Sequence, residues 1–486
     1  MSARASLCLL AAALLAGCGG GGHRAQPAPP AASPTETAAE GPAARPAKTA
    51  DARDWPTFDV TPSRTGVFTG PTPIDAGNVA RLRRQRVRLP GTVDSAPIYL
   101  HAVKVAGKRR NVFVMTTTYG RTLAVDAASG RILWTFTPRG YASWAGTPQI
   151  TQAGPTADSD RRHVFTASPD GRLHRLTLSD GREASGGRWP VSLTRDPRHE
   201  KLTSSLNLIG NRLVMTTGGY IGDAPPYQGH VVVLDRVSGR IESVFYALCS
   251  DFRRIRPPTA CPANIAAIWG RAGAVLTPRR SVLVSTGNGP FDHRRNWGDT
   301  VLELSLDGLR LRHTWTPANQ RELEASDADL GSTSPVVVPG GVLQSGKFGV
   351  LDVLSTQLRH LQQLRNPGGT AMFTAPAVWT RRGRTTVFAT TGAGTEALSW
   401  SGRRLRRLWS SGEGGTSPML AGGLLYVYDP SGSLVVRNPV NGRVLARLPA
   451  GSGHWNSPIV GGGVVALPEG NGNDHATTGT LSLYRL

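Results

Sequence analysis

The hydrophobic positions of this chain fall in short runs rather than in the spaced stripe of an amphipathic helix. Apolar runs at 112–115, 231–234 and 424–428 are separated by Gly, Asp-Gly and Ser-Gly turns. Short runs of this kind, bounded by turn residues, are typical of strands, and no helical period of 3.6 residues persists for long. Many short strands at this spacing predict an all-β protein with a closed or stacked architecture.

A repeated motif indicates which all-β architecture to expect. A small polar residue, then Pro or another small residue, then an apolar strand, recurs at 95–97, 146–148, 204–206, 264–266, 333–335, 374–376, 416–418 and 456–458. The copies are separated by about 40 to 70 residues, the range of four-stranded propeller blades with loop insertions. We therefore predict an eight-bladed β-propeller of four-stranded blades.

The ends of the repeats predict how the blades pack and how the ring closes. Several repeats pass through a Gly-containing turn to an outer strand near Trp134, Trp315 or Trp409, and each indole should bury roughly 150–250 Å² between neighbouring sheets. The last repeat, residues 481–486, lacks an outer strand, whereas residues 81–89 have spaced apolar positions and no blade of their own. We expect residues 81–89 to supply the missing strand, which would hide both free edges.

The first residues indicate where the protein resides. Residues 1–18 contain Arg4, an apolar run from Leu7 to Leu15, and a Leu-Ala-Gly-Cys sequence ending at Cys18. The run is too short to span a bilayer and reads as the core of a signal peptide. Its end resembles the bacterial lipobox, which implies lipidation of Cys18 and anchoring to the cell membrane on its extracytoplasmic face. A signal without lipidation is the alternative.

Composition divides the rest of the chain into two parts. Residues 19–54 are rich in Gly, Pro, Ala and Thr with almost no large apolar side chain, so they are predicted to form a disordered tether. Residues 55–486 should form the propeller. In an exported protein the remaining pair, Cys249 and Cys261, is most simply a disulfide, because no second Cys or His pair accompanies it as a metal site would require.

The charge changes this picture little. The formal net charge is +22, and only five of the 55 basic residues are Lys. The arginines scatter over turns and strand ends without interleaved aromatic residues, and the signal peptide predicts export, so nucleic acid is not an expected partner. Attraction to anionic lipid or to a cell-wall polymer is one use of the charge, and a simply solvated Arg-rich surface is the other.

One stretch, residues 249–347, carries a long ordered set of motifs. It contains Trp269-Gly270, a Thr-Gly-Asn turn at 286–288, Gly298-Asp299, an Asp-x-Asp turn at 327–329 and a Lys-x-Gly at 347–349. This set resembles the cofactor-bearing part of the pyrroloquinoline quinone (PQQ) dehydrogenase family. The start of the predicted domain, at 55–58 and 64–66, is also similar to that family's opening.

The resemblance implies a role for each residue of the set. Trp269 would stack on PQQ, Asn288 and Asp329 would lie at a calcium ion, Asp327 would be the catalytic base, and Lys347 would face the quinone oxygens. Each residue also has a structural interpretation: Trp269 as a blade-packing indole, Asn288 as a turn residue that tolerates left-handed φ, and Lys347 as a surface cation.

The sequence departs from the family where a further calcium ligand should lie. The segment expected to carry a Glu reads Met-Thr-Thr-Gly-Gly-Tyr at 215–220, and only Asp223, in a Pro-containing insertion, offers a replacement. Ser326 stands where the family has Trp before the base. No CxxCH haem motif is present, so electrons would need an external acceptor, and the motifs of serine hydrolases and zinc proteases are absent as well.

Two functions are consistent with these observations. The first is a membrane-anchored lipoprotein whose propeller binds a ligand or a protein partner at its central face, as outer-membrane assembly lipoproteins of the same superfamily do. The second is a calcium- and PQQ-dependent dehydrogenase that oxidises an alcohol or a sugar. The missing Glu favours the first, because it weakens the metal site while the motifs of the fold persist.

Overall fold

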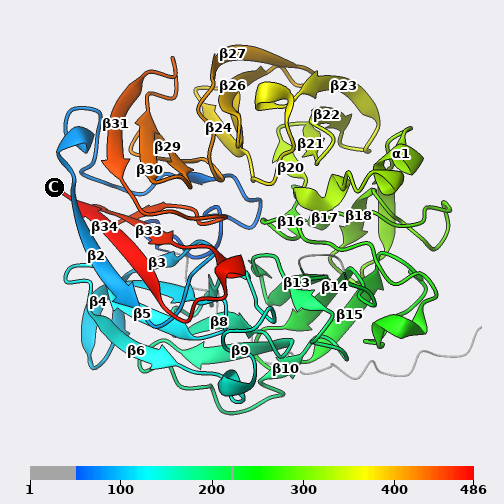
Figure 1. Ribbon diagram of the computed structural model, residues 1–486, viewed down its shortest axis with the longest axis horizontal. Coiled ribbons are helices and arrows are strands. Elements are labelled where there is room, and N and C mark those ends of the chain that lie inside the picture. The colour runs from blue at the N-terminus through cyan, green and yellow to red at the C-terminus, as the bar shows by residue number, and fades with distance from the viewer. Residues whose placement is uncertain (1–50, 221–223) are drawn as a thin grey trace, which may run out of the picture. The chain divides into compact units, whose positions relative to one another are not determined.

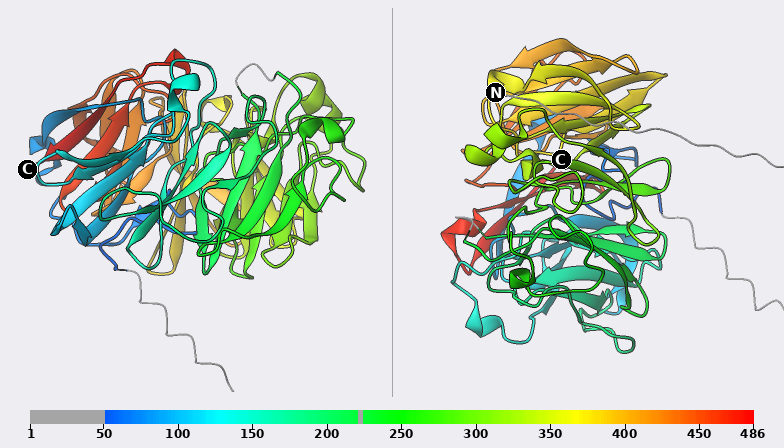
Figure 2. Two further views of the ribbon diagram at one scale, coloured as in Figure 1. Left: turned by 90° about the horizontal axis from the view of Figure 1, so that it is seen from below. Right: turned by 90° about the vertical axis from the view of Figure 1, so that its right-hand side faces the viewer.

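The computed structural model describes residues 51–220 and 224–486 and shows an eight-bladed β-propeller. Eight separate sheets, antiparallel apart from one short parallel pair, follow one another around a central axis (Figure 1). Figure 2 shows the same sheets from two further sides. In each blade the first strand lies innermost. Across blade boundaries, β3 (Ile98–Val105) approaches β32 (Ile459–Gly461) and β16 (Val275–Leu276) approaches β20 (Val336–Val338). The predicted fold class is confirmed.

Blades 1 to 4 occupy the first half of the chain. Blade 1 contains β3 (Ile98–Val105), β4 (Lys108–Thr116), β5 (Thr122–Asp126) and β6 (Ile132–Phe136), and blade 2 contains β7 (Thr156–Ala157), β8 (His163–Ser168), β9 (Arg172–Thr177) and β10 (Val191–Ser192). Blade 3 contains β11 (Lys201–Leu202), β12 (Asn207–Ile209), β13 (Arg212–Gly218), β14 (His230–Asp235) and β15 (Ile241–Tyr246). Blade 4 contains β16 (Val275–Leu276), β17 (Ser281–Ser285), β18 (Val301–Ser305) and β19 (Leu311–Trp315).

Blades 5 to 8 complete the ring. Blade 5 contains β20 (Val336–Val338), β21 (Gly341–Ser345), β22 (Val350–Ser355) and β23 (His360–Arg365), and blade 6 contains β24 (Ala377–Arg381), β25 (Arg384–Thr391), β26 (Gly394–Trp400) and β27 (Leu405–Ser411). Blade 7 contains β28 (Met419–Ala421), β29 (Leu424–Asp429), β30 (Ser433–Arg437) and β31 (Val444–Pro449), joined by β1 (Val67–Phe68). Blade 8 contains β32 (Ile459–Gly461), β33 (Val464–Glu469), β34 (Gly479–Arg485) and β2 (Arg83–Leu89).

Helices are short and lie in the connections. They are α1 (Gln320–Ala325) and the 3-10 turns η1 (Val79–Arg81), η2 (Tyr141–Ser143), η3 (Pro258–Ala260), η4 (Leu330–Ser332), η5 (Pro367–Gly369) and η6 (Gly472–Asp474). Within the described part of the chain, no helix has the length and apolar character needed to cross a membrane.

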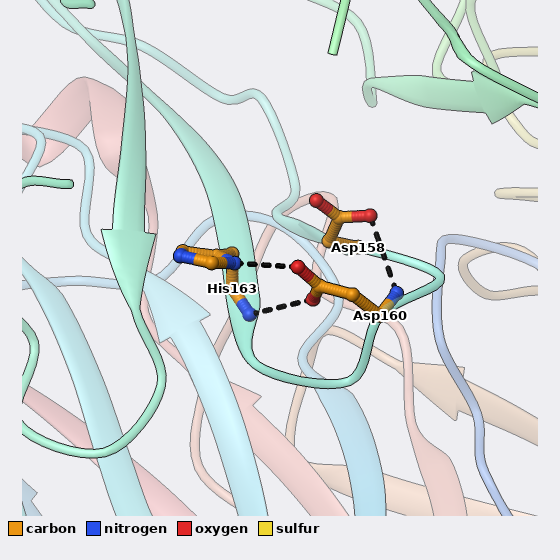
Figure 3. A group of neighbouring side chains, drawn as sticks. All are labelled: Asp158, Asp160 and His163. Atoms are coloured by element: carbon orange, nitrogen blue, oxygen red, sulfur yellow. Dashed lines mark hydrogen bonds and ion pairs between the residues drawn. The ribbon is translucent and has the colours of Figure 1, made fainter. Parts of the chain in front are cut away.

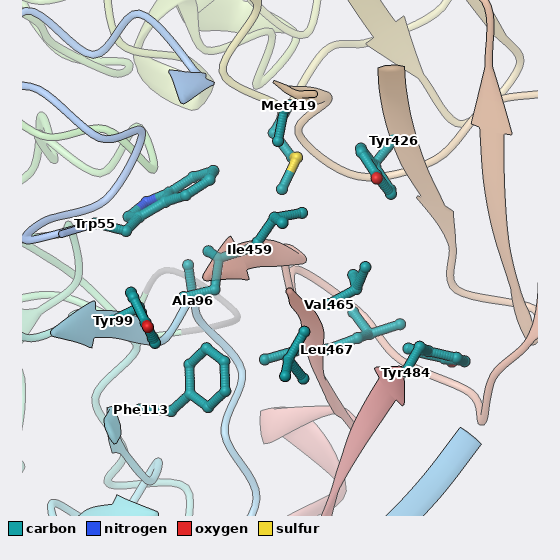
Figure 4. Close-up of a cluster of buried hydrophobic side chains, with 14 of the residues drawn as sticks. Trp55, Ala96, Tyr99, Phe113, Met419, Tyr426, Ile459, Val465, Leu467 and Tyr484 are labelled. Carbon is teal, nitrogen blue, oxygen red and sulfur yellow. The ribbon is translucent and has the colours of Figure 1, made fainter. Parts of the chain in front are cut away.

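The ring closes through the predicted pairing of the two ends of the domain. Strand β2 pairs antiparallel with β34 along its whole length, from Arg83 opposite Arg485 to Leu89 opposite Gly479, and the blue and red strands lie side by side in Figure 1. Apolar side chains from blades 1, 7 and 8 pack beside this seam (Figure 4). Blade 8 therefore depends on chain segments from both ends of the domain.

The outer tryptophans pack as the repeat pattern predicts. The Trp134 indole on β6 donates to the Leu178 carbonyl of blade 2 at 2.9 Å, and the Trp409 indole on β27 donates to the Pro439 carbonyl of blade 7 at 3.0 Å. Gly181, with φ +74°, accommodates the first contact, because a Cβ there would lie 2.4 Å from the Trp134 ring. Each indole thus links one blade to the next.

Two of the eight predicted blade starts are displaced. The motifs at 146–148 and 264–266 are not followed directly by strands; the inner strands begin later, at Thr156 and Val275. In both repeats a loop insertion separates the motif from the strand, and the second follows the loop closed by the Cys249–Cys261 disulfide, with sulfurs 2.00 Å apart. The sequence motif recurs there without marking the first residue of the sheet.

A segment before β2 crosses the propeller axis. We call residues 55–68 the plug, because their backbone bonds to blades 1, 2, 4, 6 and 7 through the pairs Trp55–Tyr99, Pro56–Ala157, Pro62–Leu276, Thr65–Val378 and Gly66–Leu420. The buried Arg64 guanidinium adds hydrogen bonds to the carbonyls of Leu206, at 2.7 Å, and Ala272, at 3.0 Å. The plug therefore ties together blades that are not neighbours.

The ordered contacts of the domain begin slightly before Trp55. The Asp54 carboxylate is buried and accepts a hydrogen bond from the His101 backbone N–H at 2.7 Å. It also forms an ion pair with the Arg161 guanidinium at 2.7 Å. The predicted signal peptide, Cys18, most of the tether and Asp223 lie outside the described residues.

Candidate functional site

A pocket of about 350 Å³ opens at the centre of the propeller. Its lining comes from loops of several blades and comprises Gln152, Lys201, Thr203, Gly219, Tyr220, Tyr227, Ala267, Trp269, Asp327, Asp329, Lys347, His454, Trp455 and Asn473. The volume lies in the range of sites that hold a small organic molecule. We call this cavity the axial pocket.

The residues selected from the sequence converge on the axial pocket. Trp269, Asp327, Asp329 and Lys347 line it directly. Asn288, in the turn after β17, adjoins it, because its side-chain amide donates to Asp327 Oδ1 at 2.8 Å. These residues come from the loop before β16, the turn after β17, the segment after α1 and the β21–β22 hairpin. The ring of inner strands brings them together.

Lys347 lies between the two carboxylates. Its Nζ is 3.1 Å from Asp327 Oδ2 and 2.6 Å from Asp329 Oδ2, and it is 5.7 Å from the centre of the Trp269 ring. Burial alone would lower the pKa of the Lys347 ammonium, but the two carboxylates outweigh it and raise the pKa. Lys347 is therefore a firmly protonated cation paired with both acids.

The Asp329 carboxylate is fixed from a second side. It is buried, and its Oδ1 accepts the Asn288 backbone N–H at 2.8 Å. Gly287 permits this approach, since a Cβ at that position would lie 2.2 Å from Asp329 Oδ1. Burial raises the pKa of Asp329, although Lys347 and the Asn288 N–H oppose the rise.

Asp299 provides a further acid behind the pocket wall. It is fully buried, and its Oδ1 accepts the Leu330 backbone N–H at 3.0 Å. Burial, with a smaller contribution from the nearby Asp329 charge, raises the pKa of Asp299 to about 7. Asp299 was recognised in the sequence as part of the motif set, but its burial and altered pKa could not be read from the motif.

As arranged here, these groups are a poor fit to a calcium ion. Ca²⁺ prefers six to eight oxygen ligands, whereas the space between Asp327 and Asp329 is spanned by the Lys347 ammonium, and Asn288 presents its N–H groups to the two carboxylates. Across 51–220 and 224–486, the only group of three or more His, Cys, Asp or Glu with ligand atoms close enough to share an ion lies elsewhere. The positive charge between the two carboxylates is therefore that of the Lys347 ammonium.

That other group is Asp158, Asp160 and His163, in blade 2 (Figure 3). Its charges are already paired: Arg236 contacts Asp158 at 2.5 Å, and Arg175 contacts both carboxylates at 3.4 Å. His163 Nδ1 lies 2.7 Å from Asp160 Oδ2. The cluster is an ion-pair network that joins blades 2 and 3.

The opposite wall of the axial pocket was missed by the sequence analysis. His454 and Trp455, from the loop between β31 and β32, stack with ring centres 4.5 Å apart, and the Trp455 ring lies 5.9 Å from that of Trp269. They are more than 180 residues from Trp269 and belong to no motif of the resembled family. A Gly-rich loop that carries His-Trp was the only available signal.

Asp94 holds this wall in place. Its buried carboxylate accepts hydrogen bonds from the Trp455 N–H at 2.8 Å and the Gln152 amide at 2.8 Å, and it pairs with His454 Nδ1 at 2.8 Å. Burial would raise the pKa of Asp94, but the His454 partner and Arg271 lower it to about 2. Gln152 in turn accepts a hydrogen bond from Lys201, so the second lysine of the pocket belongs to the same network.

Comparisons with known proteins agree with the fold. Residues 78–243 match the family model described as outer membrane protein assembly factor BamB. No curated protein sequence matches the chain.

The similar solved structures include quinohemoprotein alcohol dehydrogenases and a BamB protein. A quinohemoprotein alcohol dehydrogenase from Pseudomonas putida HK5 has a TM-score of 0.69 at 14% identity, covering 90% of this chain and 80% of that one. The Comamonas testosteroni enzyme of the same description has a TM-score of 0.67 at 15% identity, covering 90% and 81%. BamB from Moraxella catarrhalis has a TM-score of 0.52 at 15% identity, covering 83% and 100%. At these identities the likeness concerns the fold.

Proposed function

We propose that this protein, a β-propeller of the PQQ-binding-like fold, binds a small planar organic molecule in its axial pocket and does not catalyse calcium-assisted oxidation. The observation that carries the proposal is the pairing of Lys347 with both Asp327 and Asp329. A divalent ion there would have to displace the half-buried Lys347 ammonium from its two partners. Among the described residues, no third His, Cys, Asp or Glu places a ligand atom close enough to share an ion with Asp327 and Asp329.

The pocket supports binding of a flat ligand with polar edges. Trp269, Trp455, Tyr220 and Tyr227 contribute aromatic surface, which favours stacking of a planar ring. Lys201 and Lys347 lie on the walls as donors for ligand oxygens, and Asn473 adds an amide. Two of the five lysines of an Arg-rich chain thus meet at one cavity. An ammonium is a compact point charge, whereas a guanidinium is a larger planar group with donors in a fixed fork.

PQQ is the probe that tests this function, because it is planar and carries oxygen atoms at its edges. We expect saturable quenching of tryptophan fluorescence on PQQ titration, with the same dissociation constant in excess Ca²⁺ and in excess chelator. Trp269→Leu should weaken binding at least about tenfold by removing aromatic contact. Trp134→Leu, far from the pocket on an outer strand, is the matched control. Absence of quenching in every condition would remove the proposal.

The alternative is a PQQ- and calcium-dependent dehydrogenase acting on an alcohol or sugar. Convergence of Trp269, Asn288, Asp327 and Lys347 favours it, as does the Asp327 side chain, which is 61% exposed and so open to a substrate hydroxyl. In that case PQQ binding would require Ca²⁺, alcohols would reduce an added dye, and Asp327→Asn would abolish dye reduction while sparing PQQ binding. We expect no dye reduction.

The location follows from the N-terminal sequence rather than from the fold. We propose that Cys18 is lipidated and holds the propeller at the extracytoplasmic face of the membrane, where a protein partner or anionic polymer could also reach it. Cys18→Ala should leave the protein in the soluble fraction or unprocessed. Mass spectrometry of the membrane-bound form that found an unmodified Cys18 would contradict this.

A further inference from the structure

The two lysines of the axial pocket have opposite environments. Lys347 is paired with two carboxylates, whereas Lys201, at the start of β11, is 6% exposed and forms no ion pair within 4.0 Å in the described chain. It contacts the neutral Gln152 amide oxygen and the Tyr220 ring, whose centre is 5.9 Å from Nζ. A buried ammonium without a counter-charge favours its neutral form.

Among the described residues, the charged groups around Lys201 do not supply a direct ion-pair partner. Asp94 reaches it only through Gln152, and that carboxylate already pairs with His454. Arg271, also buried, carries a charge of the same sign. Burial lowers the pKa of Lys201 to about 8, Asp94 opposes the shift, and Arg271 adds to it. About one molecule in ten would then present a free amine at pH 7.

We propose that Lys201 is a nucleophilic amine that captures an aldehyde or ketone entering the axial pocket. The inference rests on the proposed function, since it assigns a chemical class to the ligand of that pocket, but it depends on a different residue. A desolvated amine beside another cation is the arrangement that activates lysine toward carbonyl compounds. Trp269 and Tyr227 supply aromatic walls nearby.

The chemistry balances without a cofactor. The nitrogen lone pair of neutral Lys201 attacks the carbonyl carbon, forming a C–N bond as the C=O π bond breaks. The carbinolamine then loses its oxygen together with the two amine protons as water, leaving a C=N bond. Addition of water reverses the sequence, so the ligand is held reversibly.

Reductive trapping with glyoxylate tests the proposal. The full chain is incubated with glyoxylate and cyanoborohydride, which reduces the imine to a stable secondary amine, and the modified lysines are mapped by mass spectrometry. At pH 7 we expect Lys201 to be modified at least about tenfold faster than the surface residues Lys104 and Lys108, because a larger fraction of it is unprotonated. Its rate should rise with pH and level off above about pH 8.

Lys347 is the matched internal control. It lines the same cavity, yet its carboxylate partners keep it protonated, so it should remain unmodified under conditions that label Lys201. Lys201→Arg preserves the charge, removes the reactive amine and should abolish the pocket label without changing that of Lys104. Labelling of Lys201 no faster than the surface lysines in the wild-type chain would overturn the proposal.

The two proposals can fail separately. Glyoxylate has no ring, so its capture does not depend on stacking against Trp269. Rapid labelling of Lys201 without PQQ binding would refute the planar-ligand function alone. PQQ binding with an unreactive Lys201 would refute the capture of carbonyl compounds alone.

Discussion

Lys347 shows how a single side chain decides the chemistry of this pocket. Replacing it by Met removes the Lys347 ion pair from the buried Asp329 carboxylate, which keeps its hydrogen bond from the Asn288 N–H. Removing one partner of a buried pair costs about 3–5 kcal/mol, and the partial exposure of Lys347 reduces this to about 2 kcal/mol. Lys347→Met should therefore lower the free energy of unfolding by about that amount in urea titrations at pH 7.

Two further variants make the Lys347 prediction specific. Lys347→Arg retains a cation and should recover most of the loss. Adding Asp329→Asn to Lys347→Met removes the unpaired charge and should also recover stability. If Lys347→Met and the double variant were equally unstable, lost packing rather than an unpaired carboxylate would be the cause.

Asp299 predicts how stability depends on pH. Its folded pKa, about 7, is above the unfolded value of 3.8, so the native state holds this proton more tightly. The associated stability is fully present below the unfolded pKa and is lost as pH rises through about 7. Asp299→Asn cannot ionise, so its stability relative to the wild type should increase by about 2 kcal/mol between pH 5 and pH 8.

Urea unfolding of both proteins at pH 5 and pH 8 measures this difference. Asp307→Asn, at an exposed turn, is the control and should show no comparable change. A constant difference between wild type and Asp299→Asn at the two pH values would mean that Asp299 is already ionised at pH 5.

The sequence could predict half of this site and could not predict the rest. Trp269, Asn288 and Asp327 belong to motifs with fixed order, so the resemblance placed them at one cavity. Lys201 and Trp455 come from other blades and carry no motif, and they reach the cavity only because the ring closes. The pairing of Lys347 with both carboxylates likewise depends on side-chain distances that spacing along the chain does not determine.

At the level of elements, the sequence pattern predicted the number of sheets better than the residues at which their inner strands begin. Six of the eight blade starts immediately precede an inner strand. Five of these six end in Pro, which favours an extended conformation in the residue before it and so leads the chain into the sheet. The other two were displaced by insertions of irregular structure. The plug was not predicted at all, since its contacts are with loops and inner strands and impose no hydrophobic period.

Strand β2 carries the most direct test of how the elements fit. Leu89 is 1% exposed and packs in the core cluster that joins blades 1, 7 and 8. Leu89→Ala should lower the free energy of unfolding by about 2–4 kcal/mol through the lost contacts and the cavity left behind. Arg83→Ala, exposed at the start of the same strand, should change it by less than about 0.5 kcal/mol. Equal small effects would show that β2 does not close the ring in solution.

In the molecule as a whole, the blades are held together across the axis by the plug as well as around the ring by the pairing of β2 with β34. Arg64 exemplifies this, because its guanidinium joins the plug to carbonyls at Leu206 and Ala272. Arg64→Met would leave buried carbonyl oxygens without donors, at about 1–3 kcal/mol for each. We expect a loss of at least about 3 kcal/mol in thermal or urea unfolding, against no measurable loss for Arg81→Met at the exposed end of η1.

Closure of blade 8 by both ends of the domain also determines when the protein can finish folding. Gln85 and its partner Arg485 are 400 residues apart, so a chain emerging from a ribosome or a translocation pore presents β2 long before β34 exists. Throughout that interval the backbone N–H and C=O groups of β2 stand unpaired, as an edge to which other strands can add. Strand β2 is therefore open to unwanted pairing until synthesis ends. A premature stop only slightly upstream of β34 would release an open array with two adhesive edges instead of a ring.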